Sequence, residues 1–179
     1  DTIPVYCYTD YPAAELFVNG VSQGKIEKNQ DSKLDRYRLR WNNVIYQPGT
    51  LKVVAYDENG NVAEEQETHT AGKPVGLRLT TDRTKLIADG NDLSFITVEV
   101  IDKEGNLCPQ AKIPLIVETS GAGTFKAICN GNPTSLELFH KPTMKTFNGK
   151  LVVIVQAGTK AGVANLNIKG KGIKNKRME

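Results

Sequence analysis

The chain has 179 residues, of which 39% are hydrophobic and 24% are charged, so it can hold one large domain or two small ones and is too apolar for a disordered protein. Its longest apolar run is Leu151–Val155, far short of the roughly 18 residues of a membrane-spanning helix. The net charge of +3 comes from residues 169–179, which hold five basic residues and one acid, so the rest sums to −1 and predicts no nucleic-acid partner.

The first third of the chain has the pattern of short strands joined by tight turns. In AELFVNGVSQGKI, two apolar runs flank Asn19-Gly20, a dipeptide that favours the type I′ turn of a β-hairpin. In RYRLRW, Tyr37, Leu39 and Trp41 alternate with three arginines. This alternation predicts a strand with the first set on a core and the arginines in water. A Pro-Gly turn at 48–49 then leads into another strand.

The segment HTAGKPVG at 69–76 is the best candidate for a domain boundary. Two glycines, a proline and a lysine follow an acidic run there, and a new apolar pattern begins directly afterwards. Beyond it, strand patterns recur every 8 to 12 residues or so with turn residues between them, which is typical of sandwiches. In FITVEVI, for example, apolar residues at 96, 98 and 100 alternate with Thr97 and Glu99. We therefore expect two all-β domains in tandem, with a basic tail at 171–179.

The three cysteines, Cys7, Cys108 and Cys129, cannot all pair with one another. No two of them have the C-x-x-C spacing of a zinc site. One disulfide with one free thiol is a possible arrangement. Three buried thiols that act as small apolar side chains are the favoured alternative.

The acids and histidines do not form a catalytic pattern. Glycoside hydrolysis needs two carboxylates about 5 to 9.5 Å apart, yet Glu99 and Glu118 lie within strands and are expected to point outward. A Ser-His-Asp site would need His69 or His140, and no G-x-S-x-G motif accompanies either. The clusters DENGN and ADGND lack the spacing of a calcium loop and suit β-turns. We predict no catalytic residue, metal site or cofactor in this chain.

Residues Cys129–Lys150 interrupt the strand pattern with a long stretch, and loops of this length are usually functional or disordered. We interpret it as a structured loop in which Phe139 and Phe147 anchor the segment against the sandwich. Its polar side chains are expected to bond the loop's own backbone; they are Asn130, Asn132, Thr134 and Ser135. A direct contact with sugar is the alternative.

Sugar-binding modules present flat aromatic rings, and the chain has twelve aromatic residues. Trp41 belongs to the apolar face of its strand and is expected to be a core anchor. Tyr11 and Tyr46 are the candidates for an exposed sugar contact.

Several motifs together resemble the C-terminal region of glycoside hydrolase family 2, in its β-galactosidase-like branch. They are AELFVNGVSQGK, the run from Trp41 through YQPGTLKVVAYDENG, and TAGKP. The stretch LRLTTDRTKLIADGNDLSFITVEVIDKEGN is similar to the last immunoglobulin-like domain of that family, and also to immunoglobulin-like repeats of bacterial adhesins. The resemblance covers residues 3 to 170. It departs at Asn132, where the family often has an acid, and at Lys145, where arginine is common, so an ion pair between these positions is in doubt.

The resemblance implies two tandem immunoglobulin-like β-sandwich domains, at 1–72 and 73–170. It also implies a bacterial glycosidase, periplasmic or secreted, whose catalytic glutamates lie in an upstream (β/α)₈ barrel of about 250 residues that cannot fit here. The expected role is therefore non-catalytic support of that barrel, with the loop covering one end or edge of the last domain. The expected partners are the upstream catalytic domain, a second copy of the chain, or carbohydrate. A carbohydrate-binding module and an adhesin-like spacer are the alternatives.

Overall fold

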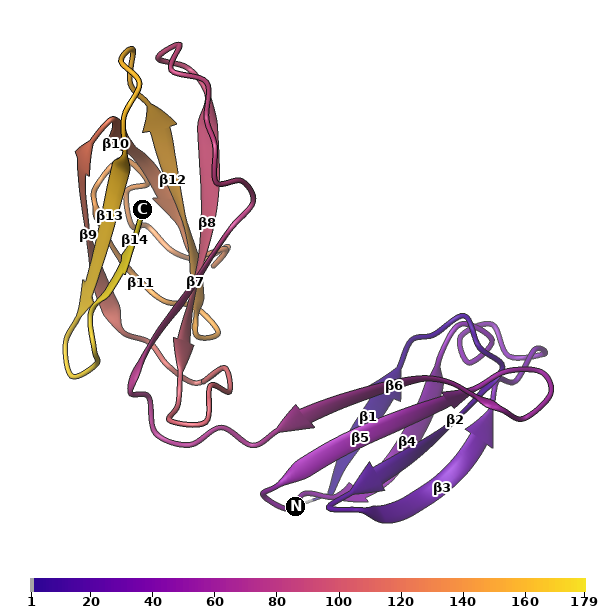
Figure 1. The fold of residues 1–179 in the computed structure, drawn as a ribbon. Coiled ribbons are helices and arrows are strands. Elements are labelled where there is room, and N and C mark those ends of the chain that lie inside the picture. The colour runs from indigo at the N-terminus through magenta and orange to yellow at the C-terminus, as the bar shows by residue number, and fades with distance from the viewer. Residues whose placement is uncertain (1) are drawn as a thin grey trace. The chain divides into compact units, whose positions relative to one another are not determined.

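The computed structural model describes residues 2–179, which form fourteen strands (Figure 1). The prediction of an all-β fold is confirmed. The chain divides into two compact units, the first ending at Thr70 and the second beginning at Ala71. Within the described part of the chain, no helix is long and apolar enough to cross a membrane.

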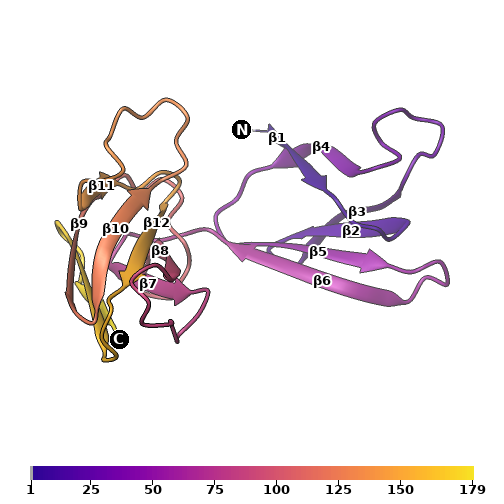
Figure 2. The same ribbon diagram turned by 90° about the horizontal axis from the view of Figure 1, so that it is seen from above.

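The first unit packs a two-stranded sheet over a four-stranded sheet, and Figure 2 shows the two layers. The order of the small sheet is β1-β4, and that of the large sheet is β3-β2-β5-β6. The strands are β1 (Thr2–Cys7), β2 (Ala13–Val18), β3 (Val21–Glu27), β4 (Leu39–Ile45), β5 (Thr50–Tyr56) and β6 (Val62–His69). The core between the layers is made of small and aliphatic side chains with one tryptophan: Ala14, Leu16, Val18, Leu39, Trp41, Val44 and Ala55.

Two of the predictions for this unit are confirmed and one is wrong. Asn19 and Gly20 have φ of 49° and 80°, as the type I′ hairpin between β2 and β3 requires. Trp41 is buried, and its indole N–H donates to the carbonyl of Gly24 at 2.8 Å. Tyr37, predicted to face the core, is 61% exposed. The reason is local, because the backbone N–H of Tyr37 closes a turn on the carbonyl of Leu34, and the strand begins only at residue 39.

The second unit is a sandwich of two four-stranded sheets. Their orders are β10-β12-β8-β7 and β11-β9-β13-β14. The strands are β7 (Gly76–Thr81), β8 (Leu93–Ile101), β9 (Pro114–Gly121), β10 (Gly123–Cys129), β11 (Thr143–Lys145), β12 (Lys150–Ala157), β13 (Ala164–Gly170) and β14 (Lys176–Met178). Ile96, Val98 and Val100 are buried in its core, as the alternation in FITVEVI predicts.

The second unit begins at Ala71, inside the boundary segment 69–76 and two residues before the expected first residue 73. It begins before residue 73, because Ala71 packs against the core and the Gly72 N–H donates to the buried carboxylate of Asp102 at 2.8 Å. The basic segment 171–179 is not a separate tail. Residues 176–178 form the edge strand β14 beside β13, and Met178 packs against the core, so the end of this segment is held on the sandwich.

The three thiols are free, so the disulfide alternative is wrong. Cys108 is buried, whereas Cys7 and Cys129 are half-buried. The favoured prediction of three buried thiols is therefore confirmed fully only for Cys108. Burial raises the pKa of the Cys108 thiol, and of the Cys7 thiol as well.

Candidate functional site

The loop that follows β10 is tied to the sandwich at both ends. The N–H of Ile128 donates to the carbonyl of Phe139, and that of Val117 donates to the carbonyl of Pro142, each at 2.8 Å. Part of the stretch expected to be loop is strand, because β11 pairs with β9 at residues 143–145. The free loop is thus residues 130–142.

The side chains of Asn130, Asn132 and Ser135 bond the backbone of this stretch, as predicted, whereas the Thr134 hydroxyl bonds the Asn132 side chain. The Asn130 amide donates to the carbonyl of Lys145 at 2.9 Å, and its oxygen accepts the N–H of Asn132 at 3.0 Å. The Asn132 side-chain oxygen accepts both the N–H and the hydroxyl of Thr134. Ser135 accepts the N–H of Glu137. These nested turns give the loop a defined shape without a hydrophobic core of its own.

Glu137 is a loop residue that sequence reasoning missed. Its carboxylate accepts the backbone N–H of Lys145 at 3.0 Å and the hydroxyl of Ser135 at 3.3 Å. Together with Asn130, it therefore holds both backbone groups of Lys145. The sequence offered one signal for this role, because Glu137 is an acid between two leucines in a segment with no strand pattern. Lys145 thus enters this network through its main chain, so an ion pair with position 132 is not needed to hold the loop.

Of the two aromatic anchors expected in the loop, Phe139 is not an anchor. Phe139 is 55% exposed, so that prediction is wrong, and Phe147 is half-buried. The buried side chains are Met144 and Thr146, which are 1% and 3% exposed. The Thr146 hydroxyl donates to the carbonyl of Ala111 at 2.8 Å and accepts the N–H of Ile113 at 3.0 Å. Met144 points inward because β11 pairs with β9, an assignment that the aromatic pattern alone cannot give.

An apolar surface remains on the loop once its polar groups are bonded. Leu136 is 95% exposed, and Leu138 and Phe139 are each 55% exposed. Three large apolar side chains within four residues are exposed on a segment whose backbone is held in place. We call Leu136, Leu138 and Phe139 the loop patch. An exposed apolar cluster of this kind is typical of a surface that contacts another protein segment.

The two strand glutamates are held as carboxylates. Glu99 on β8 lies between Lys150 and Arg78 of the neighbouring strands, at 2.9 and 2.7 Å. Burial by itself would raise the pKa of Glu99, but the hydrogen bonds from Lys150 and Arg78 outweigh it and lower the pKa. The hydrogen bond from Lys169 lowers the pKa of Glu118. A general acid of a glycosidase needs the opposite, a raised pKa.

The two tyrosines predicted for sugar contact lie in different places. Tyr11 lines a hollow of about 840 Å³ in the first unit, together with Tyr6, Tyr8 and Tyr37. Tyr46 is half exposed outside this hollow, with its hydroxyl 3.4 Å from that of Thr70. The fold therefore places Tyr11 near three tyrosines that sequence reasoning did not select, and leaves Tyr46 apart.

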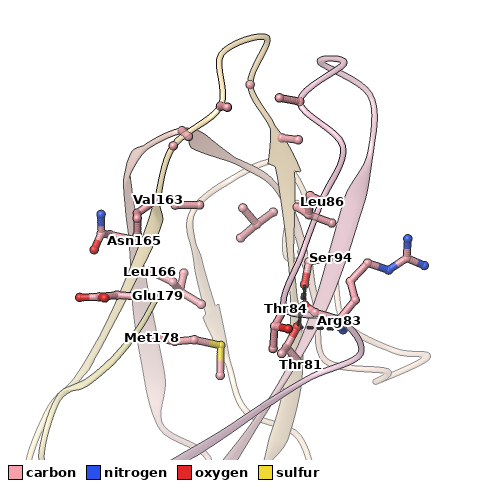
Figure 3. Close-up of a pocket in the computed structure, with 18 of the residues that line it drawn as sticks. Thr81, Arg83, Thr84, Leu86, Ser94, Val163, Asn165, Leu166, Met178 and Glu179 are labelled. Atoms are coloured by element: carbon pink, nitrogen blue, oxygen red, sulfur yellow. Dashed lines mark hydrogen bonds between the residues drawn. The ribbon is translucent and has the colours of Figure 1, made fainter.

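A second cleft, of about 530 Å³, lies between the two sheets at one end of the second unit (Figure 3). Leu86 and Val163 lie on opposite walls, and Leu166 and Met178 lie deeper along the β13–β14 wall. The hydroxyls of Thr81 and Ser94 are 2.7 Å apart, and Thr81 donates to the carbonyl of Arg83. Its central hydroxyls thus have partners within the protein, and the walls are largely apolar.

Family models match most of the chain. Residues 77–179 match the glycoside hydrolase family 2 C-terminal domain 5, and residues 1–64 match a domain of unknown function, DUF4982.

The similar proteins and solved structures are glycoside hydrolases as well. The chain is 44% identical over 173 residues to the β-galactosidase BoGH2A of Bacteroides ovatus, an alignment that covers 96% of this chain and 20% of that protein. A glycosyl hydrolase family 2 member from Bacteroides cellulosilyticus matches with a TM-score of 0.90 and 34% identity, over 98% of this chain and 23% of that one. A β-glycosidase from Bacteroides vulgatus matches with a TM-score of 0.90 and 28% identity, over 99% and 22%. The chain thus spans about a fifth of the length of these proteins.

Proposed function

Because this chain belongs to the C-terminal domains of glycoside hydrolase family 2, we propose that it is the non-catalytic C-terminal part of a β-galactosidase-type enzyme. The observation that carries the proposal is the 44% identity to a β-galactosidase over nearly the whole of this chain but only 20% of the relative. A region of that size leaves the rest of such an enzyme free to hold a catalytic barrel of about 250 residues.

The state of the strand glutamates supports a non-catalytic role. Glu99 and Glu118 are paired with lysine or arginine side chains that lower their pKa, so each is a poor proton donor at neutral pH. We expect that, in the presence of this chain alone, an aryl β-galactoside is hydrolysed no faster than at the uncatalysed rate. Turnover that Glu99→Gln or Glu118→Gln abolishes would overturn the proposal.

The loop patch gives this supporting role a physical form. Leu136, Leu138 and Phe139 are exposed on a loop that Asn130 and Glu137 hold in shape. We propose that this patch is buried against the catalytic part of the same polypeptide. Burial of apolar surface contributes roughly 25 cal/mol per Å², so three such side chains can stabilise an interface inside one chain.

Substitution of the loop patch tests this contact. The triple variant Leu136→Ser, Leu138→Ser, Phe139→Ser should leave the Tm of this chain unchanged, because its side chains are exposed here. In the parent enzyme the same variant should lower the Tm of the catalytic part and the activity after heating. Ile87→Ser, at an exposed apolar position of the second unit outside the loop patch, is the control and should change neither. A triple variant with the Tm of the unaltered parent enzyme would refute the contact.

A further inference from the structure

The hollow in the first unit is an open side of the sandwich, with side chains suited to a ligand. It is lined by tyrosines from the end of β1 and the segments that follow β1 and precede β4, and by residues 64–66 of β6. Tyr8 is 71% exposed, Tyr37 is 61% exposed and Tyr6 is 44% exposed. All six tyrosines and the one tryptophan of the chain lie in the first unit, and four of these tyrosines line this hollow.

The hollow exists because the two-stranded sheet β1-β4 covers only part of the four-stranded sheet β3-β2-β5-β6. The small sheet β1-β4 lies over the large sheet, whose edge strand β6 is exposed along its whole length (Figure 2). The register places Glu64 opposite Ala55 and Gln66 opposite Val53. Ala55 and Val53 belong to the core face, so Glu64 and Gln66 continue that face with polar groups. If β6 packed against a hydrophobic core, its side chains on this face would be apolar. Because they are polar, this face of β6 is suited to contact with water.

We propose that this hollow binds a neutral saccharide. A tyrosine ring offers an apolar face to the C–H groups of a pyranose ring, and its hydroxyl can bond sugar hydroxyls. The Glu64 carboxylate and the Gln66 amide of β6 can bond the sugar hydroxyls, as can the Asp10 carboxylate, which lies between Tyr8 and Tyr11 in the sequence. Aromatic walls with a few convergent polar groups are the usual make-up of a small-molecule site.

The rings are held by neighbouring cations. The guanidinium of Arg38 lies 5.0 Å from the centre of the Tyr6 ring, and that of Arg36 lies 4.7 Å from the centre of the Tyr37 ring. Each contact is a cation–π interaction of about 0.5–1 kcal/mol at an exposed site. Such contacts restrict the rings before a ligand arrives, which lowers the entropy cost of binding.

The charges of the hollow select against acidic sugars. Asp10, Glu64 and Glu65 line it, and of the nearby cations Arg38 is already paired with Asp35, as Lys52 is with Glu65. The ammonium of Lys28 lies beside the hollow, where it donates to the carbonyl of Thr9. A uronic acid would bring another carboxylate toward Asp10 and Glu64, and no lysine or arginine is among the described residues that line the hollow. Like charges brought together disfavour binding. The geometry therefore favours uncharged pyranosides over uronates.

Binding of defined oligosaccharides to this 179-residue chain tests the proposal. We would titrate a β-linked galactotetraose, a cellotetraose and a tetragalacturonate, following the intrinsic fluorescence of the first unit and the heat of binding. At least one neutral tetrasaccharide should bind, and the uronate should bind more weakly. Tyr8→Ala and Tyr37→Ala should each lower the affinity for the neutral tetrasaccharide about tenfold. Tyr46→Ala, which removes an exposed tyrosine of the same unit outside the hollow, should not.

The acidic side chain of Glu64 can be neutralised to test the selection against acidic sugars. Glu64→Gln keeps the size of the side chain and removes one negative charge, so it should narrow the difference in affinity between the neutral tetrasaccharide and the uronate. Circular dichroism of every variant confirms that the sheets are intact. The proposal is overturned if neither neutral tetrasaccharide binds, if Tyr46→Ala weakens binding as much as Tyr8→Ala, or if the uronate binds the unaltered chain as tightly as the neutral ligand.

Discussion

The side chain of Asn19 closes around Gly49 and joins the two turns at one end of the first unit. Its amide donates to the carbonyl of Pro48 at 3.1 Å, and its oxygen accepts the N–H of Thr50 at 2.8 Å. Gly49 has φ of 135°, and a Cβ there would lie 1.9 Å from that oxygen. Asn19 and Pro48 are 29 residues apart in the sequence. The hydrogen bond between them therefore joins the Asn-Gly and Pro-Gly turns into one structural element.

Asn19→Ala should lower the stability of the first unit by at least about 1–2 kcal/mol, because two hydrogen bonds are lost. Alanine also disfavours the φ of 49° at this position. Gly49→Ala should cost more, since it adds both a forbidden φ and the clash with Asn19. The double variant should be less destabilised than the sum, because removal of the Asn19 side chain removes the clash. Trp41 fluorescence in urea measures all three, since Trp41 lies in this unit. Strict additivity would contradict the contact.

The loop should be stabilised by its polar bonds and not by its exposed ring. Asn130→Ala should cost about 1 kcal/mol, whereas Phe139→Ala should change the stability by less than about 0.5 kcal/mol. Met144→Ala, at the buried position of β11, should cost about 2–5 kcal/mol. Far-UV circular dichroism follows the unfolding of both units, and Trp41 fluorescence reports the first unit alone, so the two signals together isolate the change in the second unit. A large loss with Phe139→Ala would restore the aromatic anchor that the burial contradicts.

Asp102 links the start of the second unit to the turn that follows β8, because its carboxylate accepts the N–H groups of Gly72, Glu104 and Asn106. The N–H of Gly72, and next the N–H of Asn106, lower the pKa of this carboxyl. A lowered pKa means that the contribution to stability is present above the unfolded pKa of about 3.9 and is lost as the pH falls through the folded value. Asp102→Asn should therefore lower the Tm at neutral pH, and the difference from the unaltered chain should shrink below about pH 4. Glu104→Gln, an exposed neighbour, is the control, and a difference independent of pH would argue against this assignment.

Cys108 should be the protected thiol of the native chain. It is 4% exposed, and burial raises its pKa, so both access and thiolate formation are disfavoured. With a disulfide-exchange reagent at about pH 8, the half-buried Cys7 and Cys129 should react first, and Cys108 only at the rate of local opening of the second unit. Under denaturing conditions all three thiols should react. Mass spectrometry of the labelled peptides gives the order, and early labelling of Cys108 would contradict its burial.

Local pattern determined much of this protein from the sequence alone. The Asn19-Gly20 turn, the alternation at Ile96, Val98 and Val100, and the place of Trp41 depend on backbone φ and on the period of two along a strand. The self-bonded turns of Asn130 and Asn132 also depend on residues two positions apart. These properties depend on neighbouring residues, so the order of amino acids is enough to predict them.

Only the tertiary structure decided the rest, because it depends on which strands meet. Phe139 is exposed and Met144 is buried because β11 pairs with β9, a partner more than twenty residues away. Residues 176–178 became a strand because β13 offered an edge to them, although their composition is that of a solvated tail. The four tyrosines came together because two strands cover four and leave the polar face of β6 open. Composition and period describe what a segment can do, and pairing between distant segments selects what it does.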